Sequence, residues 1–203
     1  ELSGMCAEMR NGIMRKEYPE LATTLSDIYL VDGGSAVLAP MSVKSQQNTY
    51  KALTDLGVKV RLNSQVKDYT DGTVYFADGK TIKTEILIWA AGVSAKVFDG
   101  IPAEAYGRGR RMLVDEHNKL TLFPNIYAVG DTCLQVTDPQ FPNGHPQLAQ
   151  VAIQQALHLA KNFKAMVSNK PLTPFSYNDM GSMAIIGKNK AVVDLEKPKV
   201  HFN

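Results

Sequence analysis

A glycine and an aspartate end a short apolar run in the second half of the chain. The run Ile126–Val129 leads directly into Gly130 and Asp131. This order predicts a buried strand whose carboxyl end carries both residues, and α/β sheets bind ligands at that end. Glycine allows a close backbone approach, and the carboxylate can accept a hydrogen bond from a ribitol or ribose hydroxyl. A strand followed by an ordinary turn would give the same letters, so both interpretations stay open here.

A second aspartate, Asp32, follows the apolar run Ile28–Val31 and precedes Gly33-Gly34. At this place in a dinucleotide-binding domain, an acidic residue accepts hydrogen bonds from the adenosine ribose and favours NADH over NADPH. On this feature alone, an ordinary turn aspartate is the better interpretation. The two glycines follow the acidic strand end, so they are not the phosphate-binding glycine loop.

A long helix is predicted from Gln147 to Ser168. Gln150 and Gln154 are one turn apart, so both side chains can reach one ligand. No carboxylate occurs between Pro139 and Asn178, whereas a merely solvated face usually mixes both charges. The start of the helix offers free amides and a positive dipole end, which can stabilise the negative charge of a reduced flavin. The predicted core face consists of Ala152, Ala156, Leu159, Phe163 and Met166.

The elements that position these residues alternate between helices and strands at first. An amphipathic helix is expected over residues 1–14, with Leu2, Met5, Met9 and Ile13 at helical spacing. A strand follows at 28–31, then a helix from Ser42, which caps it, to Leu56, with Gly57 just past its end, and a strand at 58–62. This order is typical of a parallel α/β sheet.

The pattern then changes to a small antiparallel meander. Extended pieces at 65–69, 74–76 and 81–82 are separated by the Asp-Gly pairs 71–72 and 78–79, which favour hairpin turns. Further strands are predicted at 86–89, 112–114 and 126–129, and a C-terminal hairpin at 183–186 and 191–195. The predicted fold class is therefore α/β, with an incomplete Rossmann-like, three-layer domain that contains an antiparallel β-meander.

Composition narrows the function classes. The chain has 203 residues and a net charge of +2, which is too small to indicate nucleic acid. The two cysteines, Cys6 and Cys133, are far apart and form no C-x-x-C motif, and the histidines show no metal-ligand spacing. No metal site is expected. No apolar run reaches the length of a membrane-spanning helix.

Several segments together resemble the type II NADH:quinone oxidoreductases. The resemblance rests on Glu1-Leu-Ser-Gly4, Asp32, Ile86–Val93, Thr121–Asp131, Ala149–Gln154, Gly181–Gly187 and Lys190–Asp194. These are flavoproteins with two dinucleotide-binding domains. The resemblance implies a domain for NADH over 1–93, without its first strand and glycine loop. It also implies the C-terminal part of the FAD domain over 94–172, with the quinone-site helix, and a β-hairpin region over 173–203.

The resemblance also implies an activity: electron transfer from NADH through FAD to a membrane quinone in a respiratory chain, without proton pumping. Its implied catalytic residues are Glu1, near the nicotinamide and flavin, and Gln150 and Gln154, at the quinone. Its implied cofactor-binding residues are Asp32, Ala91, Gly92, Gly130, Asp131, Gln147, Leu148 and Ala149.

The implied partners are NADH, menaquinone or ubiquinone, a membrane surface reached through a segment beyond Asn203, and a second copy in a homodimer. The implied location is peripheral, on the cytoplasmic face of a bacterial inner membrane. Because half of the family's sequence and the anchor are missing, the fragment itself is expected to be soluble and inactive. Two alternatives remain: a soluble NADH oxidase or ferredoxin reductase, and a non-catalytic NADH-responsive interaction protein.

Overall fold

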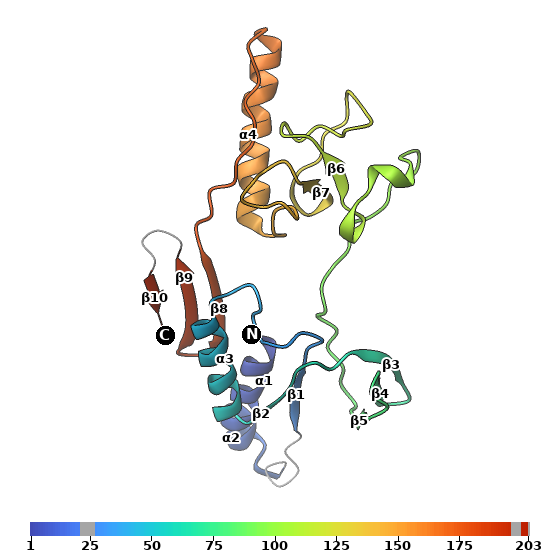
Figure 1. Cartoon of the computed structure of the whole chain (residues 1–203). Helices are drawn as coiled ribbons and strands as arrows, with labels where there is room; N and C mark the ends of the chain where they lie inside the picture. Colours follow the sequence, from blue (N-terminus) through green and yellow to red (C-terminus); the bar gives the residue numbers. More distant parts are fainter. Residues whose placement is uncertain (21–26, 196–199, 203) are drawn as a thin grey trace. The chain divides into compact units, whose positions relative to one another are not determined.

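The computed structural model describes residues 1–20, 27–195 and 200–202. The chain forms two compact units (Figure 1). The first comprises Glu1–Ala91 and Met180–Asn203, and the second comprises Gly92–Asp179. The region predicted as a separate C-terminal part, 173–203, is thus divided between the two units at residue 180.

The first unit contains a parallel pair of strands, β1 (Ile28–Val31) and β2 (Val58–Arg61). The helix α3 (Val43–Asp55) connects them along the chain. The Ser42 side chain accepts a hydrogen bond from the Ser45 amide, and Gly57 takes a φ of +80°, so the predicted cap and left-handed end are confirmed.

The N-terminal helix forms, but its apolar stripe does not face the core. It consists of α1 (Leu2–Met9), a π-helical turn (Arg10–Met14) and α2 (Arg15–Glu17). The buried residues of α1 are Gly4 and Ala7. A Cβ on Gly4 would lie 1.7 Å from the Ile186 carbonyl oxygen, so the helix touches the neighbouring strand through its smallest residues. The predicted stripe is exposed as a result: Leu2, Met5, Met9 and Ile13.

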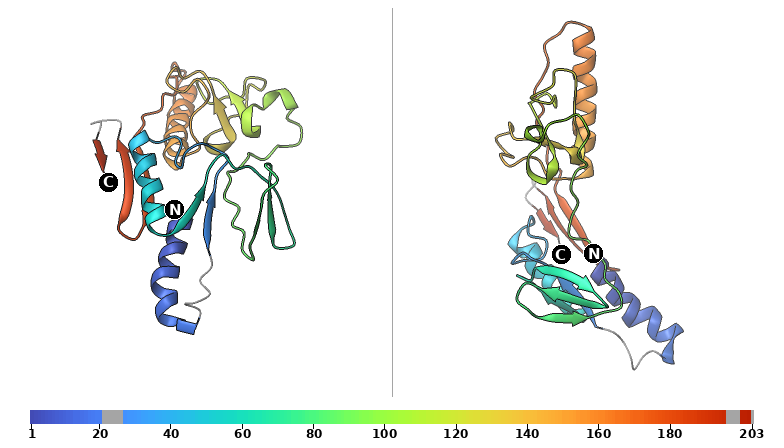
Figure 2. Two further views of the ribbon diagram at one scale, coloured as in Figure 1. Left: turned by 60° about the horizontal axis from the view of Figure 1, so that its bottom comes forward. Right: turned by 90° about the vertical axis from the view of Figure 1, so that its right-hand side faces the viewer.

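An antiparallel sheet completes the core of this unit. Its strands are β8 (Ser182–Gly187), β9 (Lys190–Leu195) and β10 (Val200–Phe202), and the predicted hairpin is confirmed. The first two strands lie beside α3 (Figure 2). Asp194 joins them to the start of α3, because its carboxylate accepts hydrogen bonds from the Ser42 amide and from the hydroxyls of Ser42 and Ser45. The shared core contains Ala7, Val37, Leu53, Val58, Ala184, Ile186 and Val192.

The predicted meander is present, but the strand expected after it is not. The meander comprises β3 (Val66–Thr70), β4 (Thr73–Phe76) and β5 (Thr81–Lys83), and Asp71 and Gly72 form the first turn with φ of 48° and 68°. The prediction of a strand over 86–89 is wrong. This segment pairs with no strand in the described part of the chain, and Ile86 and Trp89 are 77% and 64% exposed.

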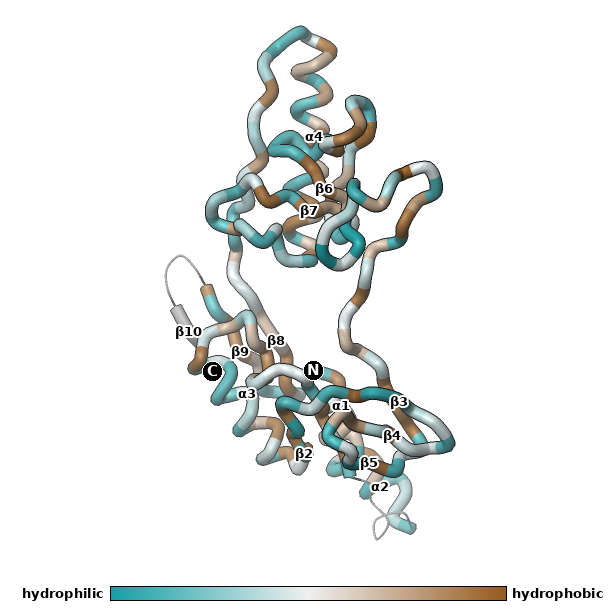
Figure 3. The backbone as a smooth tube through the Cα atoms, turned by 45° about the vertical axis from the view of Figure 1, so that its right-hand side comes forward, coloured by the Kyte–Doolittle hydropathy of each residue, from teal (hydrophilic) through white to brown (hydrophobic). Residues whose placement is uncertain are grey.

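The second unit is built on two short parallel strands, β6 (Met112–Val114) and β7 (Cys133–Gln135), which carry hydrophobic stretches (Figure 3). The sequence did not predict β7. The strand predicted at 126–129 is wrong: Tyr127 forms only an isolated bridge with Lys119. The backbone of this segment bonds instead to the turn before it, from the Leu120 amide to the Ile126 carbonyl and from the Ala128 amide to the Asn118 carbonyl.

The long helix α4 (Ala149–Val167) agrees with the prediction to within two residues, but its buried face differs. The buried residues are Val151, Gln155 and Asn162, because both amides find partners in other segments. The predicted core face is wrong in large part, since Ala156, Phe163 and Met166 are exposed.

Candidate functional site

The turn at Gly130–Thr132 lies against the first half of α4. Gly130 has a φ of +67°, and its amide donates a hydrogen bond of 2.7 Å to the Gln155 Oε1. A Cβ on Gly130 would lie 3.1 Å from the Cβ of Ala152, so both the backbone angle and the close approach favour glycine. The helix therefore fixes the turn in place.

The residues predicted to bind a flavin meet at this turn. The Gln147 Nε2 donates to the Asp131 carbonyl oxygen at 3.4 Å, which joins the turn to the start of α4. Leu148 is the N-cap residue and offers no side-chain cap. In the described part of the chain, the Asp131 carboxylate is exposed and has no hydrogen-bond partner. Gln147, Leu148 and Ala149 are exposed as well.

The two glutamines predicted at a quinone site lie on α4, both half-buried. The amide group of Gln154 is engaged twice by Asn178: its Nε2 donates to the Asn178 carbonyl at 2.9 Å, and its Oε1 accepts from the Asn178 amide at 3.0 Å. A ligand that contacts Gln154 must therefore compete with this backbone segment.

A buried arginine, Arg111, contacts two segments that lie between the Gly130 turn and the start of α4. Arg111 is 5% exposed, and its Nε donates to the Cys133 carbonyl at 2.7 Å. Its Nη2 donates to the His145 carbonyl at 3.0 Å. Burial lowers the pKa of this guanidinium, which is the direction expected for a desolvated cation. Arg111 thus connects the strand after the Gly130 turn with the loop before α4.

That loop contains a buried acid and base. The His145 Nε2 lies 3.0 Å from the Asp138 Oδ2, and both side chains are almost completely buried. Burial acts to raise the pKa of Asp138, but hydrogen bonds from His145 and from the Gln140 and Tyr177 amides outweigh it and lower the pKa. The ring of His145 also packs against Tyr177. These contacts hold the loop that leads into α4.

The remaining predicted residues belong to the first unit or its border. Asp32 is exposed directly after β1, and its Oδ1 accepts from the Gly34 amide at 2.7 Å. The Glu1 carboxylate accepts a hydrogen bond from the Ile185 amide at 3.0 Å. Ala91 and Gly92, both exposed, mark the border between the two units, and Gly92 has a φ of +103°.

The sequence did not predict Gln155 and Arg111 as site residues. Gln155 bonds to the Gly130 amide, and Arg111 bonds to the Cys133 and His145 carbonyls. Gln155 could have been found, because it lies one turn after Ala152 on the same face of the helix. A small residue and an amide at that spacing are suited to a close backbone contact. Arg111 carries no comparable signal, since it lies in a basic cluster with Arg108 and Arg110.

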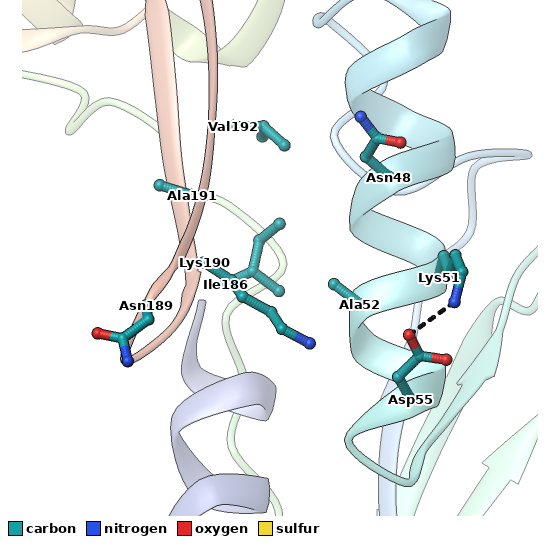
Figure 4. Close-up of a pocket in the computed structure, with 9 residues that line it drawn as sticks. All are labelled: Asn48, Lys51, Ala52, Asp55, Ile186, Asn189, Lys190, Ala191 and Val192. Carbon is teal, nitrogen blue, oxygen red and sulfur yellow. Dashed lines mark hydrogen bonds and ion pairs between the residues drawn. The ribbon is translucent and has the colours of Figure 1, made fainter. Parts of the chain in front are cut away.

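A shallow groove lies elsewhere, between α3 and the β8–β9 hairpin (Figure 4). It contains none of the predicted site residues. Its carboxylate, Asp55, forms an ion pair of 2.8 Å with Lys51, and the hydrogen bond from Lys51 lowers the pKa of Asp55. The groove is lined by Asn48, Lys51, Ala52, Asp55, Ile186, Asn189, Lys190, Ala191 and Val192.

Among the described residues, no group of three or more histidine, cysteine or acidic side chains is arranged to hold a metal ion. None of the helices described is both long and apolar enough to span a bilayer.

Comparison with known proteins gives consistent matches. Residues 16–156 match the family model described as pyridine nucleotide-disulphide oxidoreductase. The chain is 31% identical to the type II NADH:quinone oxidoreductase Ndh of Mycobacterium tuberculosis, over 96% of this chain and 43% of that protein. It is 29% identical to the type II NADH:quinone oxidoreductase of Haemophilus influenzae, over 88% of this chain and 40% of that protein. The chain thus spans about two fifths of the length of these relatives.

Solved structures show the same fold. NDH2 from Plasmodium falciparum in complex with NADH matches with a TM-score of 0.85 and 19% identity, over 99% of this chain and 56% of that chain. A sulfide:quinone oxidoreductase from Aquifex aeolicus matches with a TM-score of 0.69 and 12% identity, over 94% of this chain and 46% of that chain. The predicted Rossmann-like fold class is confirmed.

Proposed function

The chain belongs to the pyridine nucleotide-disulphide oxidoreductase family, and from this premise we propose that it is part of a flavoprotein that transfers electrons from NADH through FAD to a quinone. The observation that carries the proposal is the turn at Gly130–Asp131, fixed against the start of α4. The names of the relatives, type II NADH:quinone oxidoreductases, support the choice of substrates.

The residues at this turn fit a flavin cofactor. A side chain at Gly130 would crowd Ala152, and the exposed Asp131 carboxylate can accept a hydrogen bond from a ribitol hydroxyl. The start of α4 presents amides and a positive dipole end, suited to the negative charge of a reduced flavin. We assign FAD binding to Gly130, Asp131, Gln147, Leu148 and Ala149. When bound, FAD accepts a hydride and passes on two electrons.

NADH is assigned to residues of the first unit and its border. Asp32 is assigned to the adenosine ribose, whose hydroxyls can donate hydrogen bonds to its exposed carboxylate. The Gly34 amide donates a hydrogen bond to the Asp32 Oδ1 and so orients this carboxylate. Glu1 is assigned to the nicotinamide end. Ala91 and Gly92 allow a close approach of the backbone to the cofactors. We accordingly assign NADH to the first unit, Glu1–Ala91 with Met180–Asn203, and FAD to the second unit, Gly92–Asp179.

The quinone is assigned to Gln150 and Gln154, whose side-chain amides can donate hydrogen bonds to a quinone carbonyl oxygen. Because Gln154 is held by Asn178, quinone binding and this contact compete for the same amide. The quinone is menaquinone or ubiquinone. The whole protein is proposed to be a homodimer, bound peripherally to the cytoplasmic face of a bacterial inner membrane through a further segment.

The two half-reactions of the full-length natural protein test this proposal. Gln154→Ala should slow flavin reoxidation by a soluble quinone about two- to tenfold, since one hydrogen bond between neutral groups contributes about 0.5–1.5 kcal/mol. Flavin reduction by NADH should change little. Lys161→Ala, an exposed position on the same helix, is the matched control and should leave both rates unchanged. Equal losses of rate in both half-reactions would contradict the assignment of Gln154 to the quinone site.

A further inference from the structure

A buried asparagine, Asn118, lies in the turn that follows β6. It is 0% exposed and has a φ of +63°, a left-handed conformation that asparagine adopts more readily than most residues. Its carbonyl oxygen accepts a hydrogen bond from the Ala128 amide at 3.0 Å, and its Nδ2 donates to the Ala128 carbonyl at 3.3 Å. Asn118 therefore holds both backbone groups of the residue that lies two positions before Gly130.

The same side-chain amide also contacts the chain after the turn. The Asn118 Nδ2 donates to the Cys133 Sγ at 3.5 Å, and this sulfur also accepts a hydrogen bond from the Gln155 Nε2 at 3.6 Å. Burial raises the pKa of the Cys133 thiol, so the sulfur stays a neutral, weak acceptor. Cys133 lies two residues after Asp131. Asn118 thus connects the residues on both sides of the Gly130–Asp131 turn.

Packing alone does not explain an amide at this position. Ala128 and Cys133, which Asn118 contacts, belong to an apolar core cluster of the second unit. The Asn118 Oδ1 is buried and has no hydrogen-bond partner among the described residues, a destabilising feature that an apolar side chain would avoid. The contribution of this amide therefore comes from the two contacts of its Nδ2.

We propose that Asn118 is a positioning residue for FAD that acts through Asp131. It holds the backbone before and after the turn, so that the Asp131 carboxylate is ordered for the ribitol before FAD binds. The Asp131 carboxylate depends on such support, because it is exposed and forms no hydrogen bond of its own within the described part of the chain. Order that exists before binding does not have to be created during binding, which strengthens affinity. The inference rests on the proposed binding of FAD at this turn.

Replacement of Asn118 by glycine tests the inference in the full-length natural protein. Asn118→Gly permits the left-handed backbone and the bond from the Ala128 amide, and it removes both contacts of the Nδ2. FAD affinity, measured from the rise in flavin fluorescence when the holoprotein is diluted, should fall about three- to tenfold, since a neutral hydrogen bond contributes a factor of about this size. Asn169→Gly is the matched control, because Asn169 is exposed and has a φ of 51°. It should leave FAD affinity unchanged.

A double-mutant cycle with Asp131 separates positioning from a general loss of stability. In an Asp131→Ala background, Asn118→Gly should weaken FAD binding less than about twofold, because no carboxylate remains to be positioned. Cys133→Ala removes one acceptor of the Asn118 Nδ2 and should give a smaller loss, which also disappears in this background. This second variant tests the inference if Asn118→Gly does not fold.

Three results would overturn the inference: unchanged FAD affinity in Asn118→Gly, an equal loss in Asn169→Gly, or additive losses in the cycle with Asp131. A wild-type protein that binds no FAD, or an Asp131→Ala variant that binds FAD as tightly as the wild type, would instead overturn the proposed function on which the inference rests.

Discussion

Gln155 provides the sharpest structural prediction, because it fixes the turn that carries the candidate flavin residues. It is 1% exposed, and its Oε1 accepts the 2.7 Å hydrogen bond from the Gly130 amide. Its Nε2 also lies 3.6 Å from the Cys133 Sγ. Gln155→Leu keeps a side chain of similar size but removes the acceptor. The Gly130 amide then remains beside an apolar group, without its partner.

The cost follows from the desolvation of that amide. A fully buried donor without a partner costs about 1–3 kcal/mol, and the partly buried Gly130 amide should cost about 1–1.5 kcal/mol. Because about 1.4 kcal/mol corresponds to a factor of ten, the local opening at Gly130 should become about five- to tenfold more frequent. Native-state hydrogen exchange of the Gly130 amide measures this opening directly.

The control is Lys161→Leu, an exposed position on the same helix, which should leave Gly130 protection unchanged. Protection of the amides in the middle of α4 shows whether the helix remains folded in each variant. Unchanged exchange at Gly130 in Gln155→Leu, with α4 intact, would refute the assignment of Gln155 as the residue that holds this turn.

Three further predictions concern stability. Gly57→Ala should lower the free energy of unfolding by about 1–2 kcal/mol in urea titration, because Gly57 has a φ of +80°; an unchanged midpoint would contradict this. Ser42→Ala should cost about 1–2 kcal/mol through loss of the cap of α3 and of the bond to Asp194, and equal stability would show that water replaces both. Burial and Asp179 raise the pKa of Tyr177 to about 12, above its usual value near 10, so its contribution to stability is complete below pH 10 and is lost as the pH rises towards 12. Tyr177→Phe should therefore flatten the fall in stability across this interval, and an identical pH profile would contradict the shift.

The local elements of the first unit were predictable because their signals lie within a few residues. The hydroxyl of Ser42 and the glycine after Leu56 mark both ends of α3, and Asp71-Gly72 fixes the first turn of the meander. The strand predicted at 86–89 failed for a physical reason: an apolar run becomes a strand only where a neighbouring strand offers hydrogen bonds, and none does so among the described residues.

The proximity of the Gly130–Asp131 turn to the start of α4 was predictable from the sequence, but the residues that hold the turn in place were not. The sequence and its resemblance to a family placed Gly130, Asp131 and the start of α4 together, and the structure joins them through Gln147. The buried face of α4 was not predictable from hydrophobic periodicity, since two of its buried residues are amides. Gln155 bonds to Gly130 and Asn162 bonds to Thr173, and such distant partners leave no periodic signal.

The most direct test of the central claim is anaerobic stopped-flow absorbance of the flavin in the full-length natural protein. The account predicts that NADH reduces a bound flavin faster than NADPH does, and that a soluble quinone then reoxidises it much faster than oxygen does. Reoxidation by oxygen as fast as by quinone, or a purified protein that shows no flavin absorbance, would contradict it.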